Sequence, residues 1–127
     1  HTGNQSIDMA GTPGRGTIYQ DLATVAGTWY RVEFWLSTNG GFSANSLTLE
    51  WDDAPVATLS SPGLGNWERY EFDLVAAAAT TRLTFIGNID GNSSGALLDT
   101  VSVVEIPAPG VLTLAGIAGA SAGRRRR

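Results

Sequence analysis

The sequence has no cysteine, no lysine and a single histidine, His1, at the start of the chain. Without cysteine, disulfide scaffolds, thiolate metal sites and cysteine nucleophiles are excluded. Without an internal imidazole, a Ser-His catalytic pair and a histidine-based metal site are excluded as well. The chain also lacks P-loop and GxGxxG phosphate-binding motifs. We therefore expect a protein that is not an enzyme.

Positive charge is scarce over most of the chain. Eight arginines face twelve acidic residues, and four of those arginines form the run at the C-terminus. Residues 1–123 thus carry four positive and twelve negative charges, a net charge of 4 − 12 = −8. Nucleic acids and anionic membranes require basic patches, so this acidic body is not expected to bind either of them. Neutral, polar partners such as polysaccharides remain compatible with the charge.

Short runs rich in Val, Thr, Tyr, Phe and Trp alternate with clusters of Gly, Ser, Asn and Asp, which is typical of an all-β protein. No window of helical length shows apolar residues at a spacing of 3.6 with caps. The expected strands are Gln5–Met9, Gly16–Leu22, Thr28–Ser37, Ser46–Trp51 followed after a turn by Val56–Leu59, Trp67–Val75, Thr81–Gly87 and Leu97–Glu105.

Within these runs apolar and polar residues alternate, so each strand has one core face. In the run from residue 28 to residue 37, Val32 and Phe34 belong to the core face, and Glu33 points the other way. Seven or so short strands with one apolar face each are best buried by stacking two antiparallel sheets. We expect an all-β fold, an antiparallel two-sheet β-sandwich of the jelly-roll type.

One candidate ligand site lies on the polar face of the central run. Trp35 can offer its ring to the C–H face of a sugar, and Arg31 and Glu33 can hydrogen-bond its hydroxyls. The alternative is that an outward tryptophan simply covers a sheet edge or packs under a loop. Trp51 and Trp67 are expected in the core.

The acidic residues have mostly structural interpretations. Asp52 and Asp53 are expected to set the geometry of a turn. Glu71 and Asp73 share a strand face about 7 Å apart, a spacing that suits a glycosidase, but we expect them to be solvated surface charge. The segment 88–92, NIDGN, superficially resembles a calcium loop, yet Ser93 occupies the position where an EF-hand needs glycine. We expect a β-hairpin loop there.

The order of the motifs SIDMAG, GTWYRVEFWLS, NWERYEFDLVA and GALLDTVSV resembles the galactose-binding-like jelly rolls of bacterial cell-surface proteins, including the choice-of-anchor C type. The same architecture occurs in many carbohydrate-binding modules. The resemblance covers about residues 5–105. It implies a first strand upstream of His1 that is missing here, and one structural calcium ion with Asp99 as a ligand. No other cofactor is expected.

Residues 106–127 contain the motif Pro107-Ala108-Pro109, followed by a twelve-residue apolar segment, Val111–Ala122, and by Arg124, Arg125, Arg126 and Arg127. This layout resembles a sorting signal of the PEP-CTERM type, so we place the boundary of the sandwich domain, 1–105, before it. Twelve residues span roughly 18 Å as a helix, whereas a bilayer core needs about 30 Å. The arginines would hold their end on the cytoplasmic side.

The resemblance implies an exported protein that inserts transiently in the inner membrane, is cleaved by an exosortase-type protease, and reaches the cell surface or the extracellular space. A permanent anchor, a disordered tail and a last strand of the sandwich are the alternatives for this segment. For the whole protein we expect a non-catalytic surface or matrix protein that binds polysaccharide. A purely structural matrix or adhesion protein without a sugar ligand, and a glycan-active enzyme, are the other two hypotheses.

Overall fold

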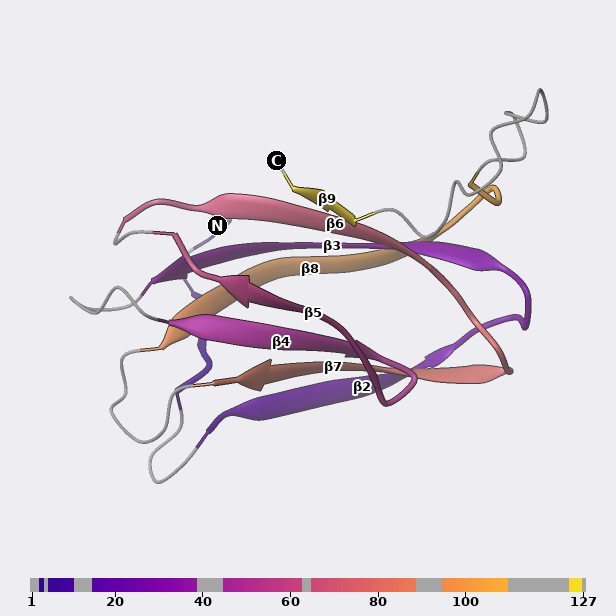
Figure 1. The fold of residues 1–127 in the computed structure, drawn as a ribbon, viewed down its shortest axis with the longest axis horizontal. Coiled ribbons are helices and arrows are strands. Elements are labelled where there is room, and N and C mark those ends of the chain that lie inside the picture. The colour runs from indigo at the N-terminus through magenta and orange to yellow at the C-terminus, as the bar shows by residue number, and fades with distance from the viewer. Residues whose placement is uncertain are drawn as a thin grey trace.

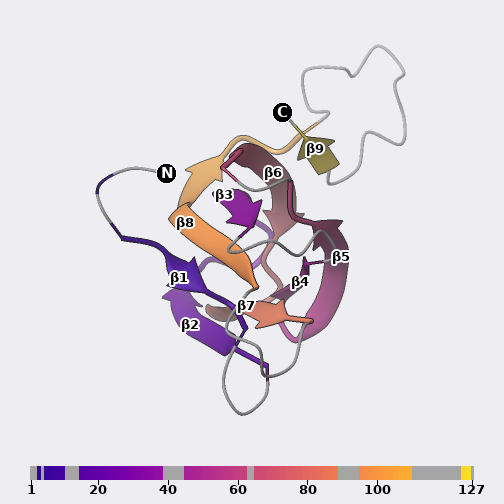
Figure 2. The same cartoon turned by 90° about the vertical axis from the view of Figure 1, so that its left-hand side faces the viewer.

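The computed structural model describes residues 3, 5–10, 15–38, 45–62, 65–88, 95–109 and, for the backbone alone, 124–126. These residues form two antiparallel sheets stacked face to face, as Figures 1 and 2 show. Sheet A has the strand order β1 (Ile7–Asp8), β8 (Ala96–Ile106), β3 (Trp29–Thr38), β6 (Glu68–Val75) and β9 (Arg124–Arg126). Sheet B has the order β2 (Thr17–Ala23), β7 (Thr80–Gly87), β4 (Ser46–Trp51) and β5 (Ala54–Ser60).

This strand order is that of a jelly roll, because successive strands mostly alternate between the two sheets. The predicted fold class, a two-sheet antiparallel β-sandwich, is confirmed. Each expected run contains a strand whose ends lie within two residues of the expected ends. Within the described part of the chain, no helix is long and apolar enough to span a bilayer.

The alternating apolar residues meet between the sheets and form the core. Phe34 of β3 lies at its centre, with its ring 5.7 Å from that of Tyr70 and 5.1 Å from that of Phe85 on the opposite sheet. Trp51 packs 6.2 Å from Tyr30 and donates its indole N–H to the carbonyl of Val75 at 2.9 Å. The buried rings therefore fill the space between the sheets, and the polar end of Trp51 still has a partner.

Two expectations about the elements are wrong. Trp67, expected in the core, is half-buried just before β6 and lies outside the core cluster, because it precedes the point where that strand enters the sandwich. The segment after Gly87 is not a hairpin loop, since β7 belongs to sheet B and β8 to sheet A, so this connection crosses between the sheets. Residues 89–94 themselves lie outside the described residues.

The turn at Asp52 and Asp53 behaves as expected. Both residues have positive φ, 56° and 63°, and they join β4 to β5 as a two-residue hairpin loop. A type I′ turn requires this conformation at both central positions, and aspartate tolerates it better than most residues. The pair therefore sets backbone geometry.

Candidate functional site

The outer face of sheet A brings together the three residues of the candidate ligand site. Arg31, Glu33 and Trp35 of β3 are flanked in register by residues of β6, namely Asp73, Glu71 and Arg69 respectively. Because β-strand side chains alternate, these residues share one face, and the buried Tyr30, Val32, Phe34 and Leu36 point the other way. The antiparallel register, which the sequence could not supply, places each β3 residue beside a particular neighbour.

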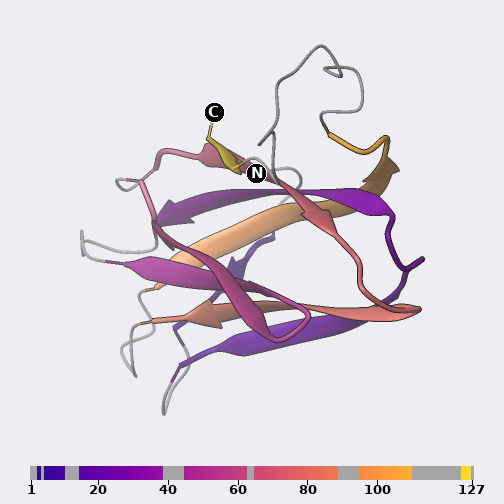
Figure 3. The same cartoon turned by 45° about the vertical axis from the view of Figure 1, so that its right-hand side comes forward.

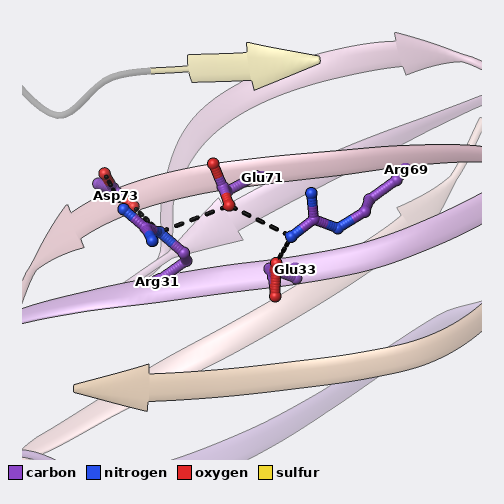
Figure 4. A network of polar contacts seen from close by, with 5 residues as sticks. All are labelled: Arg31, Glu33, Arg69, Glu71 and Asp73. Atoms are coloured by element: carbon purple, nitrogen blue, oxygen red, sulfur yellow. Dashed lines mark hydrogen bonds and ion pairs between the residues drawn. The ribbon is translucent and has the colours of Figure 1, made fainter. Parts of the chain in front are cut away.

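Five of these side chains form a network of ion pairs (Figure 4). Arg31 donates to both oxygens of Asp73, from Nε to Oδ1 at 2.8 Å and from Nη2 to Oδ2 at 3.2 Å. Its Nε also lies 3.5 Å from Oε1 of Glu71. At the other end of the network, Nη2 of Arg69 lies 3.3 Å from the same Oε1 of Glu71. The same nitrogen also forms an ion pair with Glu33. The network holds two positive and three negative charges.

The expectation that Glu71 and Asp73 are solvated surface charge is wrong. Their side chains are only 2% and 3% exposed. Two guanidinium groups lie against them and take the place of water as hydrogen-bond donors. The hydrogen bond from Arg31 to Asp73 raises the pKa of Arg31, and burial opposes this only in part. Arg31 therefore holds its positive charge more firmly than a free arginine side chain.

The network leaves parts of the predicted site accessible. The side chains of Arg31 and Glu33 remain 31% and 25% exposed, although each already has an ionic partner. Trp35 is half-buried and lies in a row between Arg69 on β6 and Asp99 on β8. A ligand on this face would stack on an aromatic ring that is bordered by a guanidinium and a carboxylate.

Asp99 lies beside an irregularity in β8. Its Oδ1 accepts a hydrogen bond from the backbone N–H of Thr100 at 2.7 Å, and Thr100 has a φ of +52°, which is uncommon for a β-branched residue. The register between β3 and β8 shifts at this point, as in a β-bulge. An open cavity of about 810 Å³ adjoins the bulge, lined in part by Gln5, Ser6 and Asp99.

The described residues do not assemble a set of ligands around Asp99. Calcium takes six to eight oxygen ligands, usually from several carboxylates. Within the described ranges no three acidic, histidine or cysteine side chains come close enough to hold a metal ion. Asn88, from the loop-like motif, instead binds the hydroxyls of Ser46 and Thr48 at 3.0 and 3.2 Å. A calcium ion at Asp99 stays a prediction.

A second polar cluster lies on the outer face of sheet B and was not anticipated from the sequence. Tyr19 is 60% exposed, and the guanidinium of Arg82 lies 4.1 Å from the centre of its ring. Arg82 also donates to both oxygens of Asp21, at 2.7 and 3.1 Å. In the sequence, Tyr19 and Asp21 are two residues apart, which predicts that they share one face of a strand. The sequence does not reveal that β7 supplies the arginine.

The tail predicted as a sorting signal is described only in part. β8 ends at Ile106, one residue beyond the expected domain boundary, and Pro107 and Pro109 follow it directly. The apolar segment and Arg127 lie outside the described residues. Arg124–Arg126 form β9 and pair with β6 at the edge of sheet A, and a last strand of the sandwich was one of the alternatives for this segment.

Comparisons with known proteins support the fold. No protein-family model matches the chain, and a search of curated proteins finds no match. Among solved structures, the chain is similar to the C-terminal domain of EclA, a sugar-binding protein, with a TM-score of 0.64, 13% identity and coverage of 82% of this chain and 80% of that one. It is also similar to a family 35 carbohydrate-binding module from an environmental isolate, with a TM-score of 0.61, 25% identity and coverage of 84% and 80%. The chain thus shares its β-sandwich with sugar-binding modules.

Proposed function

We propose that this protein is a non-catalytic, exported module that binds polysaccharide through the outer face of sheet A. The observation that supports this best is the shared fold with two sugar-binding domains, one of them a carbohydrate-binding module 25% identical to this chain. On that face Trp35 lies beside Arg69 and Asp99, an aromatic ring with flanking hydrogen-bonding groups. Neutral polyols are commonly held by such a combination.

The ion-pair network defines which atoms a sugar can use. Asp73 and Glu71 are buried under the arginines, so they support the face without offering oxygens to a ligand. The exposed parts of Arg31 and Glu33 lie on the same side and can take hydroxyl groups as further partners. A neutral polysaccharide needs no basic patch on its binding surface, so the acidic body of the chain is compatible with this ligand.

A glycan array followed by titration tests this proposal. Replacing Trp35 by alanine is expected to weaken binding of the best glycan by about tenfold or more, because a stacked aromatic ring is a typical binding hot spot. Trp29 provides the matched control, since it lies on the same strand and face but between Val75 and Ile106. If Trp35→Ala binds the glycan as tightly as the wild type and Trp29→Ala do, the proposal that the sugar stacks on Trp35 is wrong. Absence of binding to every glycan would favour the purely structural matrix protein.

We further propose that residues 106–127 direct export and sorting by an exosortase-type protease after transient insertion in the inner membrane. The proline pair, the short apolar segment and the terminal arginines support this role. Fused to a reporter in a bacterium that has such a protease, the segment is expected to shorten the fusion and move it to the surface. A fusion without the four arginines serves as the control. If both fusions keep the same mass and location, the sorting proposal is wrong.

A further inference from the structure

The C-terminal arginines pair with the edge of sheet A. β9 runs antiparallel to β6, with Tyr70 opposite Arg126, Glu71 opposite Arg125 and Phe72 opposite Arg124. Figures 1 and 3 show β9 lying along β6 at the outer edge of the sheet. Among the described strands only β9 pairs with the side of β6 that faces away from β3, and without it the backbone N–H and C=O groups on that side would have no strand partner. The tail therefore covers the part of this edge at residues 70–72.

Charge favours an arginine run at this edge. Arginine is not a favoured strand residue, and the run has no apolar side chain to bury against the sheet. The adjoining face of β3 and β6 carries three carboxylates and two guanidinium groups, which leaves one negative charge. Residues 1–123 as a whole carry a net charge of −8. A positively charged strand is thus attracted to this side of the domain.

This pairing is incompatible with insertion of the tail in a membrane. If the apolar segment Val111–Ala122 enters a bilayer as a helix with the arginines at its far end, its twelve residues hold the arginines roughly 18 Å from its start. Paired strands lie about 4.8 Å apart. β9 must therefore leave β6 before the tail can insert. This step rests on the sorting role argued under Proposed function.

We propose that the β6 edge is a docking surface for the chain's own arginine strand, and that the pair acts as a latch that holds the tail on the domain until the tail enters a membrane. The occupant of the edge is Arg124–Arg126 in the same molecule. When the tail enters the membrane, β9 leaves β6, and the backbone groups of this part of the β6 edge become accessible to another strand.

Hydrogen exchange of the full-length protein tests the latch. The readout is those backbone amides of Tyr70, Glu71 and Phe72, the β6 residues paired with β9, that point away from β3. In the wild type these amides are expected to exchange roughly tenfold more slowly than in a variant with Arg124–Arg127 replaced by serine. The reason is that an amide hydrogen-bonded to a neighbouring strand exchanges only when that pairing opens. Replacement of the same four residues by lysine keeps the charge and is expected to keep most of the protection.

Vesicles of phosphatidylethanolamine and phosphatidylglycerol then test the release. When the wild type cosediments with these vesicles, exchange of the same amides is expected to rise to the level of the serine variant, and the amides of β7 are expected to stay unchanged. Equal exchange in the wild type and the serine variant without vesicles would overturn the latch. So would full protection in the vesicle-bound protein. The reporter fusion lacks β6, so its outcome judges the sorting role independently.

Discussion

At the scale of single residues, the distinctive feature is that carboxylates on the outer face of a sheet are buried. Asp73 is 3% exposed and depends on the two hydrogen bonds from Arg31. A buried carboxylate that loses its partner keeps the cost of leaving water and has no compensating interaction. The alternation of polar and apolar residues assigned Glu71 and Asp73 to the outer face correctly. It did not show that two arginines from neighbouring positions would cover them.

The Arg31–Asp73 pair leads to a stability prediction. Arg31→Met is expected to lower the free energy of unfolding by about 3 kcal/mol, because Asp73 is then buried without a guanidinium partner. Urea denaturation measures this loss. Arg31→Met combined with Asp73→Leu is expected to recover most of the stability, since an apolar pair replaces the ion pair. A double variant as unstable as the single one would contradict this explanation.

Asp21 on sheet B leads to a prediction about pH. The hydrogen bond from Arg82 is the main cause that holds the pKa of Asp21 below its usual value. A carboxyl with a lowered pKa in the folded state stabilises the protein above its unfolded pKa, about 3.9, and this stabilisation is lost as the pH falls through the folded pKa. An NMR titration of the Asp21 carboxyl is expected to give a pKa below that of a model peptide.

The variant Asp21→Asn tests the same effect through the pH dependence of stability. The stability difference between wild type and Asp21→Asn is expected to be largest near neutral pH and to shrink as the pH falls below about 4. The pair is exposed, so the difference is expected to be small and to decrease in high salt. A difference that is independent of pH would show that Asp21 acts through something other than its charge.

At the scale of elements, the strands follow from local sequence, but their partners do not. Ser46–Trp51 was expected with its observed bounds, because alternation and a turn signal mark both of its ends. By contrast, β9 consists of arginines with no strand signal of their own and forms only beside the edge of β6. The crossing of the β7–β8 connection between sheets was also missed, since a short loop rich in Gly and Asn fits a hairpin equally well.

The hairpin between β4 and β5 offers a test at this scale. Asp53 has a φ of 63°, where glycine has no steric cost and where Asp-Gly is a preferred type I′ pair. Asp53→Gly is expected to raise the free energy of unfolding by about 0.5 kcal/mol. Asp53→Val, whose branched side chain clashes in this conformation, is expected to lower it by about 1–2 kcal/mol. Thermal unfolding of the two variants measures both changes, and the opposite order would exclude a type I′ turn.

At the scale of the whole molecule, the segment at Met9 ties the two sheets together. Met9 is 1% exposed, and its backbone N–H donates to the carbonyl of Ala96 at 2.9 Å. Its carbonyl accepts from Gly16, whose own carbonyl accepts from Gly87 at the end of β7. The chain thus passes from sheet A to sheet B in a space so narrow that only glycine fits at Gly87.

Gly87→Ala tests this closure. A Cβ at residue 87 would lie 1.8 Å from the carbonyl oxygen of Met9, so the backbone must move. We expect a loss of about 3 kcal/mol in the free energy of unfolding, measured by urea denaturation. Gly65→Ala is the control, because its Cβ meets open space and its φ of +80° alone costs about 1 kcal/mol. Equal losses in both variants would mean that the segment at Met9 has room to shift.

The sequence by itself determined the fold class, the core faces and the positions of most strands. These properties depend on short-range alternation, because a strand with one apolar face has to bury it whatever its neighbours are. Only the tertiary structure decided that Arg31 faces Asp73, that Arg82 covers Tyr19, and that the terminal arginines lie on β6. Each of these contacts joins residues far apart in the chain. Strand order and register bring them together, and the register between two strands cannot be recognised from the local sequence of either strand.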